Sequence, residues 1–474
     1  MAKGHTTGQP ATPDLIQLWY WLIPFLAQIE GSGCSEGMGP RNPVQSFQRE
    51  GNTVFTRRRF MQSAAASGLA VSASGLALPA YAQNKPIKIG FVTPQTGPLA
   101  IFAEPDAFTL DQFKAKIGDG IMINGAKHPV EFIVKDSQSS SNRASSAAQE
   151  LIFEDEVNLI LATSTPDTTN PVADQAELNG VACITNDTPW QPHFFGRGGD
   201  PAAGFQYTYH FFWGLEDVIS VFMGMWDKVE TNKVVGALWP NDPDGNGWSH
   251  PELGFPPVMA ERGYTLVDTG RYQNMTDDFS AQISAFKEAG VEIVTGVQIP
   301  PDFTTFWTQA AQQGFNPKVM QAAKATEFPQ AIAPLGDRAN GLSVEVWWSP
   351  HHPFASSFTG QSSKELADAY EAGTGNGWTM PLGFKHSLFE VAIDALQRTE
   401  DPTDADALAK AISETNLDTV VGNVNFANGP VPNVAKTPLV GGQWRMDGST
   451  PVLDIVENSD HPDIPLTGEM KPIG

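Results

Sequence analysis

Short apolar runs that alternate with helical segments are the feature of this chain that most limits its possible folds. The runs are rich in Val and Ile and are typical of parallel strands buried on both faces, with helices as the connections between them. We therefore predict an α/β fold with a parallel sheet covered by helices. The expected strands are Ile87–Val92, Val130–Val134, Val157–Leu161 and Val181–Ile184, and the expected helices are Phe108–Ile117, Arg143–Glu154 and about Pro171–Leu178.

From about residue 213 the same rhythm begins again, which predicts a second α/β unit. The length agrees with two units, because one hydrophobic core usually spans no more than roughly 250–300 residues. The expected strands here are Lys233–Leu238, Thr265–Val267, Ile293–Val297 and Lys318–Met320, and the expected helices are Pro256–Arg262, Phe279–Ala289 and Phe303–Gln313. The remainder is expected to return to helices at Lys364–Ala372, Leu382–Arg398 and Ala405–Ser413, and to close with strands at Gly422–Phe426 and Gly442–Met446.

Residues 1–82 are interpreted as a leader that precedes the folded part. The basic stretch Thr56–Phe60 (TRRRF) comes before a modestly apolar run that ends in Ala80-Tyr81-Ala82, an A-x-A cleavage site. The arginine pair followed by Phe60 resembles a twin-arginine export signal, and an arginine-rich Sec signal is the alternative. We expect cleavage near Ala82 and a periplasmic location for the mature protein.

Composition excludes several classes of protein. With 29 Lys+Arg against 53 Asp+Glu the net charge is -24, which argues against nucleic acid as a partner. The apolar run Leu15–Ile29 is shorter than the ~20 residues of a membrane span, and a later translation start such as Met38 would remove it. Of the two cysteines, Cys34 lies in the leader and Cys183 in an expected buried strand, so we expect neither a disulfide nor a metal site.

Small and hydroxyl-bearing residues follow three of the expected strands. They occupy Thr93–Pro98, Thr163–Thr169 and Thr185–Trp190. In an open parallel sheet, ligands bind outside the carboxyl ends of the strands. Two units whose strand ends face each other would form a cleft, so the sequence predicts a small-molecule site at these ends.

Five segments carry a family resemblance that extends over residues 84–450. They are Ile87–Leu99 (IKIGFVTPQTGPL), Thr169-Asn170-Pro171, Phe211–Val218 (FFWGLEDV), Phe279–Val294 and Gly422–Gly429. In order and spacing, they resemble the type I periplasmic binding proteins of the branched-chain amino-acid (Leu/Ile/Val-binding) group. These proteins are the receptor subunits of ABC importers.

The resemblance implies a fold and a function. The fold would be two Rossmann-like lobes with parallel sheets, joined by three crossovers, with residues 84–213 and 347–426 in lobe I and residues 214–346 and 427–474 in lobe II. The protein would be a non-enzymatic monomer without a cofactor that captures a small molecule between its lobes and delivers it to a cognate membrane permease. A ligand-sensing role on the same fold is the main alternative, and an exported α/β enzyme is a further one.

The resemblance also places ligand-binding residues. Hydroxyls and backbone N–H groups that hold a ligand carboxylate fall after the third and fourth strands, and aromatic positions fall on Phe102 and, with a change of residue type, on Asp244. Several short donors in a shielded cleft suit a carboxylate. The predicted carboxylate-binding residues are Ser164, Thr165, Asp167, Thr168, Asn186 and Thr188.

Lys324 is the largest departure from the family pattern. The family places an acidic residue for the ligand ammonium at or near this position, and here Glu327 follows only one turn further. A lysine in the cleft would repel an ammonium group, so we predict an organic or aromatic carboxylate ligand in preference to an ordinary amino acid. The alternative is a shifted register with Lys324 on the solvated surface.

Several aromatic residues lie beside the expected loops. Trp190, Trp213 and Trp378 are predicted to face the cleft, because aromatic faces suit a flat ligand, although core packing is the alternative for each. Asp242–Gly247 resembles the start of a calcium loop, but the twelfth position is Leu253, so we predict an ordinary turn. His351-His352 is expected to be a loop pair.

Overall fold

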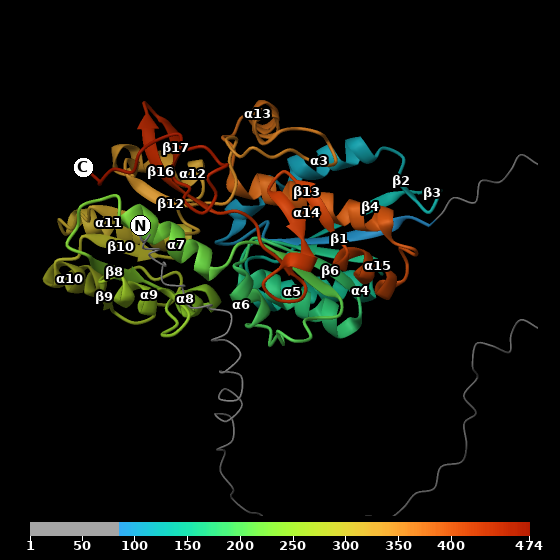
Figure 1. Ribbon diagram of the computed structural model, residues 1–474, viewed down its shortest axis with the longest axis horizontal. Coiled ribbons are helices and arrows are strands. Elements are labelled where there is room, and N and C mark those ends of the chain that lie inside the picture. Colours follow the sequence, from blue (N-terminus) through green and yellow to red (C-terminus); the bar gives the residue numbers. More distant parts are fainter. Residues whose placement is uncertain (1–84) are drawn as a thin grey trace, which may run out of the picture. The chain divides into compact units, whose positions relative to one another are not determined.

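The computed structural model describes residues 85–474 (Figure 1). The predicted leader, its export signal and its cleavage site lie outside these residues. Among residues 85–474, none of the helices combines the length and apolar character that a membrane span needs.

The first sheet is six-stranded and entirely parallel, in the order β15-β7-β6-β5-β1-β4. β5 and β6 are buried along their whole length, as the continuous apolar runs predicted. Figure 1 shows α4 and α5 on one side of this sheet and α3 and α14 on the other. The strands are β1 (Ile87–Thr93), β4 (Val130–Asp136), β5 (Leu159–Ala162), β6 (Ala182–Thr185), β7 (Thr208–Phe211) and β15 (Val434–Ala435), and the helices are α3 (Asp106–Ile117), α4 (Ser141–Phe153), α5 (Pro166–Asn179), α6 (Trp190–Phe194), α13 (Ser363–Thr374), α14 (Met380–Arg398) and α15 (Ala405–Ser413).

The second sheet is seven-stranded, in the order β17-β16-β12-β11-β10-β8-β9. Its first five strands in the chain are parallel, and β16 and β17 are added antiparallel at one edge. The strands are β8 (Val234–Leu238), β9 (Thr265–Asp268), β10 (Ile293–Gly296), β11 (Val319–Ala322), β12 (Leu342–Val346), β16 (Val440–Asp447) and β17 (Thr450–Glu457), and the helices are α7 (Leu215–Trp226), α8 (Pro243–Trp248), α9 (Phe255–Glu261), α10 (Ser280–Ala289), α11 (Pro300–Gln312) and α12 (Pro329–Ile332). The family-like fold of two α/β lobes is confirmed.

The chain passes between the two sheets at three places. It leaves the first sheet after β7, returns after β12 to the helices α13 and α14 that pack beside α3, and leaves again between β15 and β16. The predicted crossovers agree with this path. The exact lobe limits stay a proposal, and because β15 pairs with β7, we now place the third passage after Ala435 instead of after Phe426.

One local prediction was wrong. The segment predicted as a turn at Asp242–Gly247 forms most of α8, because Asp242 caps the helix by accepting a hydrogen bond from the Gly245 backbone N–H at 2.7 Å. The predicted strand at Gly422–Phe426 is confirmed as β14 (Gly422–Asn425), which pairs with β13 (Asn416–Thr419) in a two-stranded hairpin. The shorter elements are β2 (Ile121–Ile123), β3 (Ala126–His128), η2 (Ala100–Ala103), η3 (Ala333–Ala339) and η4 (Phe426–Asn428).

Candidate functional site

A small cavity lies where strands of both sheets end. Residues that follow β5 and β6 in the first sheet line it together with residues that follow β8, β10, β11 and β12 in the second. This is the location predicted for a ligand from the polar strand ends. Its lining consists of Phe102, Ser164, Thr165, Asp187, Pro189, Phe212, Trp213, Asp244, Trp248, Val297, Ala323, Lys324, Glu327, Glu345 and Trp347.

Two hydroxyls lie at the amino end of α5, on the side of the first sheet. Thr165 is the N-cap residue of this helix and Ser164 precedes it, and both side chains are buried. Neither hydroxyl has a hydrogen-bond partner within the described part of the chain. The amino end of a helix presents unpaired N–H groups and a partial positive charge, so this corner of the cavity suits a carboxylate.

Aromatic side chains form the walls of the cavity. Phe212 packs edge-on against Trp347, with ring centroids 5.2 Å apart, and lies 4.8 Å from Trp213. Phe102 packs edge-on against Phe328 at 4.9 Å. The indole N–H groups of Trp213, Trp248 and Trp347 make no hydrogen bond to residues 85–474. Such walls offer apolar faces to a flat ligand and donors for its polar atoms.

Lys324 lines the cavity but does not make it positive. Its Nζ lies 2.5 Å from Asp244 Oδ2 and 3.6 Å from Asp242 Oδ2, and all three side chains are nearly fully buried. Burial opposes the charged form of Lys324, yet the carboxylates of Asp242 and Asp244 outweigh it and raise the pKa of the amine. Burial also raises the pKa of Asp244 to about 6, although Lys324 acts against this shift.

Three further carboxyl groups reach the cavity. Asp187 follows β6 and accepts a hydrogen bond from Thr163 Oγ1 at 2.5 Å, and burial raises its pKa to about 7. Glu327 Oε1 accepts a hydrogen bond from the Lys324 backbone N–H at 2.9 Å, and burial likewise raises the pKa of Glu327 to about 7. Glu345 on β12 lies beside Glu327, and burial together with that neighbour holds its pKa well above the usual range. The cavity therefore contains more carboxyl groups than amines.

Backbone strain is concentrated at the cavity. Ser164, Asp187 and Lys324 have positive φ angles of 129°, 60° and 62°. Residues other than glycine rarely adopt this region, and the cost is typically about 1–3 kcal/mol for each. Each of the three follows a different strand, so the fold holds all three strand ends in unfavourable conformations that direct side chains into one space.

Six of the twelve predicted site residues line this cavity. They are Phe102, Ser164, Thr165, Trp213, Asp244 and Lys324. The prediction that Lys324 faces the interior agrees with its position, and its alternative placement on the surface does not, because the residue is only 7% exposed. The inference that it would repel an ammonium group loses its basis, because Asp242 and Asp244 compensate its charge.

The other predicted residues lie outside this lining. Asp167, in the first turn of α5, lines an adjacent cavity to which Thr165 and Lys324 also contribute. Asn186 Nδ2 donates to the Phe384 carbonyl at 2.8 Å. Three more have local partners. Thr168 Oγ1 donates to the Thr165 carbonyl, Trp190 Nε1 donates to Glu216, and Trp378 packs against Trp348 beside a different cavity.

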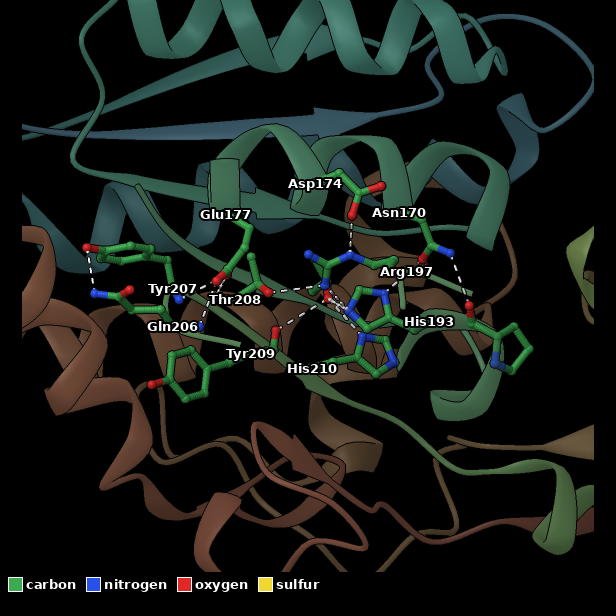
Figure 2. A network of polar contacts seen from close by, with 12 residues as sticks. Asn170, Asp174, Glu177, His193, Arg197, Gln206, Tyr207, Thr208, Tyr209 and His210 are labelled. Carbon is green, nitrogen blue, oxygen red and sulfur yellow. Dashed lines mark hydrogen bonds and ion pairs between the residues drawn. The ribbon is translucent and has the colours of Figure 1, made fainter. Parts of the chain in front are cut away.

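The backbone of Thr188 is hydrogen-bonded to His210, which belongs to a buried polar network with His193 and Arg197 (Figure 2). His210 Nε2 lies 2.7 Å from the Thr188 carbonyl oxygen, so this nitrogen must carry the proton, and Nδ1 accepts from Thr185 Oγ1 at 2.8 Å. Arg197 Nη1 donates to His193 Nε2 at 3.2 Å, and the two imidazole rings stack with centroids 4.0 Å apart. Burial lowers the pKa of both histidines, to about 3 for His210, so the rings are neutral and the network fixes the loop that carries Asp187.

Several lining residues were missed by the sequence analysis. Trp347 and Glu345 belong to β12 and the residue after it, and the run Leu342–Val346 is a signal that could have identified this strand. Phe212 lies inside Phe211–Val218, a segment already singled out for its family resemblance. Trp248 is the last residue of α8 and reaches the cavity through the packing of this helix, which no local sequence pattern indicates. Cys183 is buried in β6, as predicted, and burial raises the pKa of its thiol to about 12.

The comparisons with known proteins agree with this arrangement. The family of periplasmic binding proteins matches residues 86–448. A Leu/Ile/Val-binding protein homologue of Brucella suis is 23% identical over 400 residues, which cover 80% of this chain and 94% of that protein.

Two solved structures share the fold. A leucine-binding protein from Thermotoga maritima has a TM-score of 0.63 at 19% identity, covering 79% of this chain and 99% of its own. A solute-binding protein of an ABC transporter from Rhodopseudomonas palustris BisB5, solved in complex with 3,4-dihydroxybenzoic acid, has a TM-score of 0.62 at 20% identity, covering 78% and 95%. Homologues of this kind are non-enzymatic solute-binding proteins that work with ABC transporters, and the family is typically exported to the periplasm. This chain therefore belongs to the periplasmic binding protein family, as a type I member of the branched-chain amino-acid group.

Proposed function

We propose that this protein is the exported receptor subunit of an ABC importer and that it captures a small organic acid, with an aromatic or branched apolar body, in the cavity between its two sheets. The observation that carries the proposal is the pairing of two features in one cavity. Unpartnered hydroxyls at the amino end of α5 suit a carboxylate, and five aromatic side chains suit an apolar body. The 3,4-dihydroxybenzoic acid in the Rhodopseudomonas palustris protein is a ligand of this kind.

The lining also suggests how binding would be transmitted. Trp213 lies on the first passage between the sheets, directly before α7, and Trp347 begins the second passage after β12. A ligand that touches both passages and both sheets would favour the closed arrangement of the lobes, since a ligand shifts the population toward the state that it binds better. No catalytic group is required for this mechanism.

An amino acid is the second candidate ligand. The carboxyl groups of Asp187, Glu327 and Glu345 would accept hydrogen bonds from an ammonium group, and the Brucella suis relative is named as a Leu/Ile/Val-binding protein homologue. The two candidates share the carboxylate and differ in the second polar group.

Thermal-shift and calorimetric titrations with organic acids and amino acids test the proposal. We expect stabilisation by acids with an aromatic or branched apolar body, and at least tenfold weaker binding after Ser164→Ala or Thr165→Val. Ser284→Ala, at an exposed position of α10, is the matched control. If no acid stabilises the protein, or if the two cavity variants bind as the control does, the proposed carboxylate site is wrong.

Export is tested separately. Replacement of Arg57 and Arg58 by lysine should stop secretion through the twin-arginine route, and the secreted wild-type protein should begin near Gln83. A permease that takes up the same acid only when this protein is present would distinguish transport from the alternative of sensing. We propose a monomer, which sedimentation with and without the acid would test.

A further inference from the structure

An ion pair joins the first and third passages between the two sheets. Lys436 directly follows β15 on the third passage, and Glu216 and Asp217 lie in the first turn of α7, just after the first passage. Lys436 Nζ lies 2.7 Å from Glu216 Oε1 and 2.8 Å from Asp217 Oδ1. The three side chains are 35%, 28% and 19% exposed, so water and salt screen this contact less than they screen an exposed pair.

Glu216 also binds residues on the side of the first sheet. α7 packs on strands of the second sheet, whereas α6 follows β6 of the first. Glu216 Oε1 accepts a hydrogen bond from Trp190 Nε1 at 3.2 Å, and Oε2 accepts one from Gln191 Nε2. Gln191 Oε1 accepts a hydrogen bond from the Leu215 backbone N–H at 2.8 Å. We call Lys436, Glu216, Trp190 and Gln191 the hinge clamp, because they join both lobes and two of the three passages.

The hinge clamp is connected to the ligand cavity through α6. The Trp190 backbone N–H donates to the Trp213 carbonyl at 3.1 Å. Trp213 lines the cavity, and so does Pro189, the residue before Trp190, whereas Glu216 lies outside the lining. Glu216 can therefore act on ligand binding only through the residues that it holds in place.

Opening of the cavity would separate α6 from α7. α6 packs against α8 of the second lobe, and Trp248 on α8 lines the cavity. Phe222 on α7 packs edge-on against Trp248, with ring centroids 5.6 Å apart, so α7 and α8 would move together. Movement of α8 away from α6 would then stretch the hydrogen bonds that join Glu216 to Trp190 and Gln191. These bonds are complete only while the lobes are closed.

The charge of Glu216 contributes to the hinge clamp. Burial opposes the ionised form, but Lys436 outweighs burial and lowers the pKa of Glu216. Burial and the neighbouring Glu216 carboxylate raise the pKa of Asp217 to about 6. Glu216 therefore keeps its charge to a lower pH than Asp217, and hydrogen bonds to an ionised acceptor are stronger than those between neutral groups.

Resting on the proposed function, we propose that Glu216 is a positioning residue for ligand capture, whose hinge clamp stabilises the closed arrangement of the lobes around the ligand. The ligand and the hinge clamp favour the same state, so each increases the population in which the other makes all of its contacts. Loss of the hinge clamp would lower the closed population and with it the apparent affinity, although no contact to the ligand is removed.

Energy transfer between two fluorophores measures the closure directly. Ser146→Cys on α4 and Ser284→Cys on α10 provide one exposed label site on each lobe. Native Cys183 is buried and protected from the label. Cys34 lies in the leader that export is expected to remove.

We expect Glu216→Ala and Lys436→Met to shift the label distances toward the open arrangement. With 4-hydroxybenzoate or leucine, whichever binds the wild type, dissociation should become at least threefold faster while association changes less than twofold, because the hinge clamp forms only on closure. Lys436→Arg keeps the cation and should behave as the wild type. Glu216→Gln keeps an acceptor for Trp190 Nε1, so it should have an intermediate effect, and it replaces Glu216→Ala if that variant is unstable. Lys410→Met, which loses only an exposed pair with Glu400, is the matched control.

Label distances and dissociation rates that match those of the control in both Glu216→Ala and Lys436→Met overturn this inference but leave the proposed function intact. An effect of Lys436→Arg as large as that of Lys436→Met overturns it as well, because the cation would then not be responsible. If no acid binds and the variants still shift the label distances, the hinge clamp stands and the proposed function fails. If no acid binds and no distance shifts, both are wrong.

Discussion

Lys324 Nζ lies 2.5 Å from Asp244 Oδ2, and the two residues come from segments that follow different strands of the second sheet. Asp244 offsets the charge of Lys324, the one lysine in the cavity lining, and the ion pair links the loop after β11 to α8. Because Lys324 has a left-handed backbone and is nearly fully buried, the fold must hold this ion pair against both strain and desolvation.

Removal of the lysine should be strongly destabilising. Lys324→Met leaves Asp244 and Asp242 buried without their cation, and the loss of one partner of a buried pair costs about 3–5 kcal/mol. Urea unfolding of the variant measures this loss. The control is Lys364→Met, whose exposed pair with Asp368 contributes no more than about 1 kcal/mol. Equal unfolding midpoints for the two variants would contradict the structural importance of the buried pair.

The stacked histidines should make stability depend on pH. Burial lowers the pKa of His210 from its ordinary 6.5 to about 3 and lowers that of His193 as well, so between these values the unfolded chain binds more protons than the folded chain. Their contribution is complete above pH 6.5 and is lost as the pH falls toward 3, at up to about 1.4 kcal/mol per pH unit for each ring.

His210→Gln tests this dependence. Unfolding free energies measured from pH 7 down to pH 4 should fall less steeply for the variant than for the wild type. The variant is also expected to be less stable at pH 7, since it loses the bond to the Thr188 carbonyl. Parallel curves for the two proteins would show that the ring is not buried in its neutral form.

Two glycines on α8 should respond differently to a methyl group. A Cβ on Gly245 would lie 1.9 Å from the Pro240 carbonyl oxygen, so the backbone must move and carry Asp244 and Trp248 with it. A Cβ on Gly247 would lie 3.4 Å from the nearest side-chain atom, on Pro192, which is ordinary contact. We expect Gly245→Ala to cost about 1–3 kcal/mol and to weaken acid binding, and Gly247→Ala to change stability by less than about 1 kcal/mol. Thermal unfolding and calorimetry of both variants measure the difference.

Variants of Trp347 and Trp378 distinguish the proposed ligand cavity from a different cavity. Trp347 lines the cavity and its indole N–H has no partner in the described chain, whereas Trp378 lines another cavity. Trp347→Phe should weaken binding of 4-hydroxybenzoate about tenfold, or ~1.4 kcal/mol, and should reduce the change in tryptophan fluorescence on binding. Trp378→Phe should leave both unchanged. The opposite result would place the ligand beside Trp378, which was predicted from the sequence to face the cleft.

Much of the fold could be predicted from local sequence patterns. Val157–Leu161 and Val181–Ile184 predicted β5 and β6 to within two residues, because strands buried on both faces must be apolar throughout. Elements that depend on partners far away in the sequence could not be predicted in this way. β15 consists of Val434–Ala435 and exists only because it pairs with β7. α8 has three residues in its first turn that are not apolar, and the cap at Asp242 decides where this helix begins.

The sequence by itself determined that this is an α/β protein of two units with a polar rim at the strand ends, since the alternation of apolar runs and the residues that follow them are local properties. Only the tertiary structure decided the character of the site. Asp187 and Glu345 are far apart in the chain and line the same cavity only because strands of the two sheets end there. The carboxylates of Asp242 and Asp244 likewise offset the positive charge of Lys324. Only the fold places these carboxylates within a few ångströms of the buried amine.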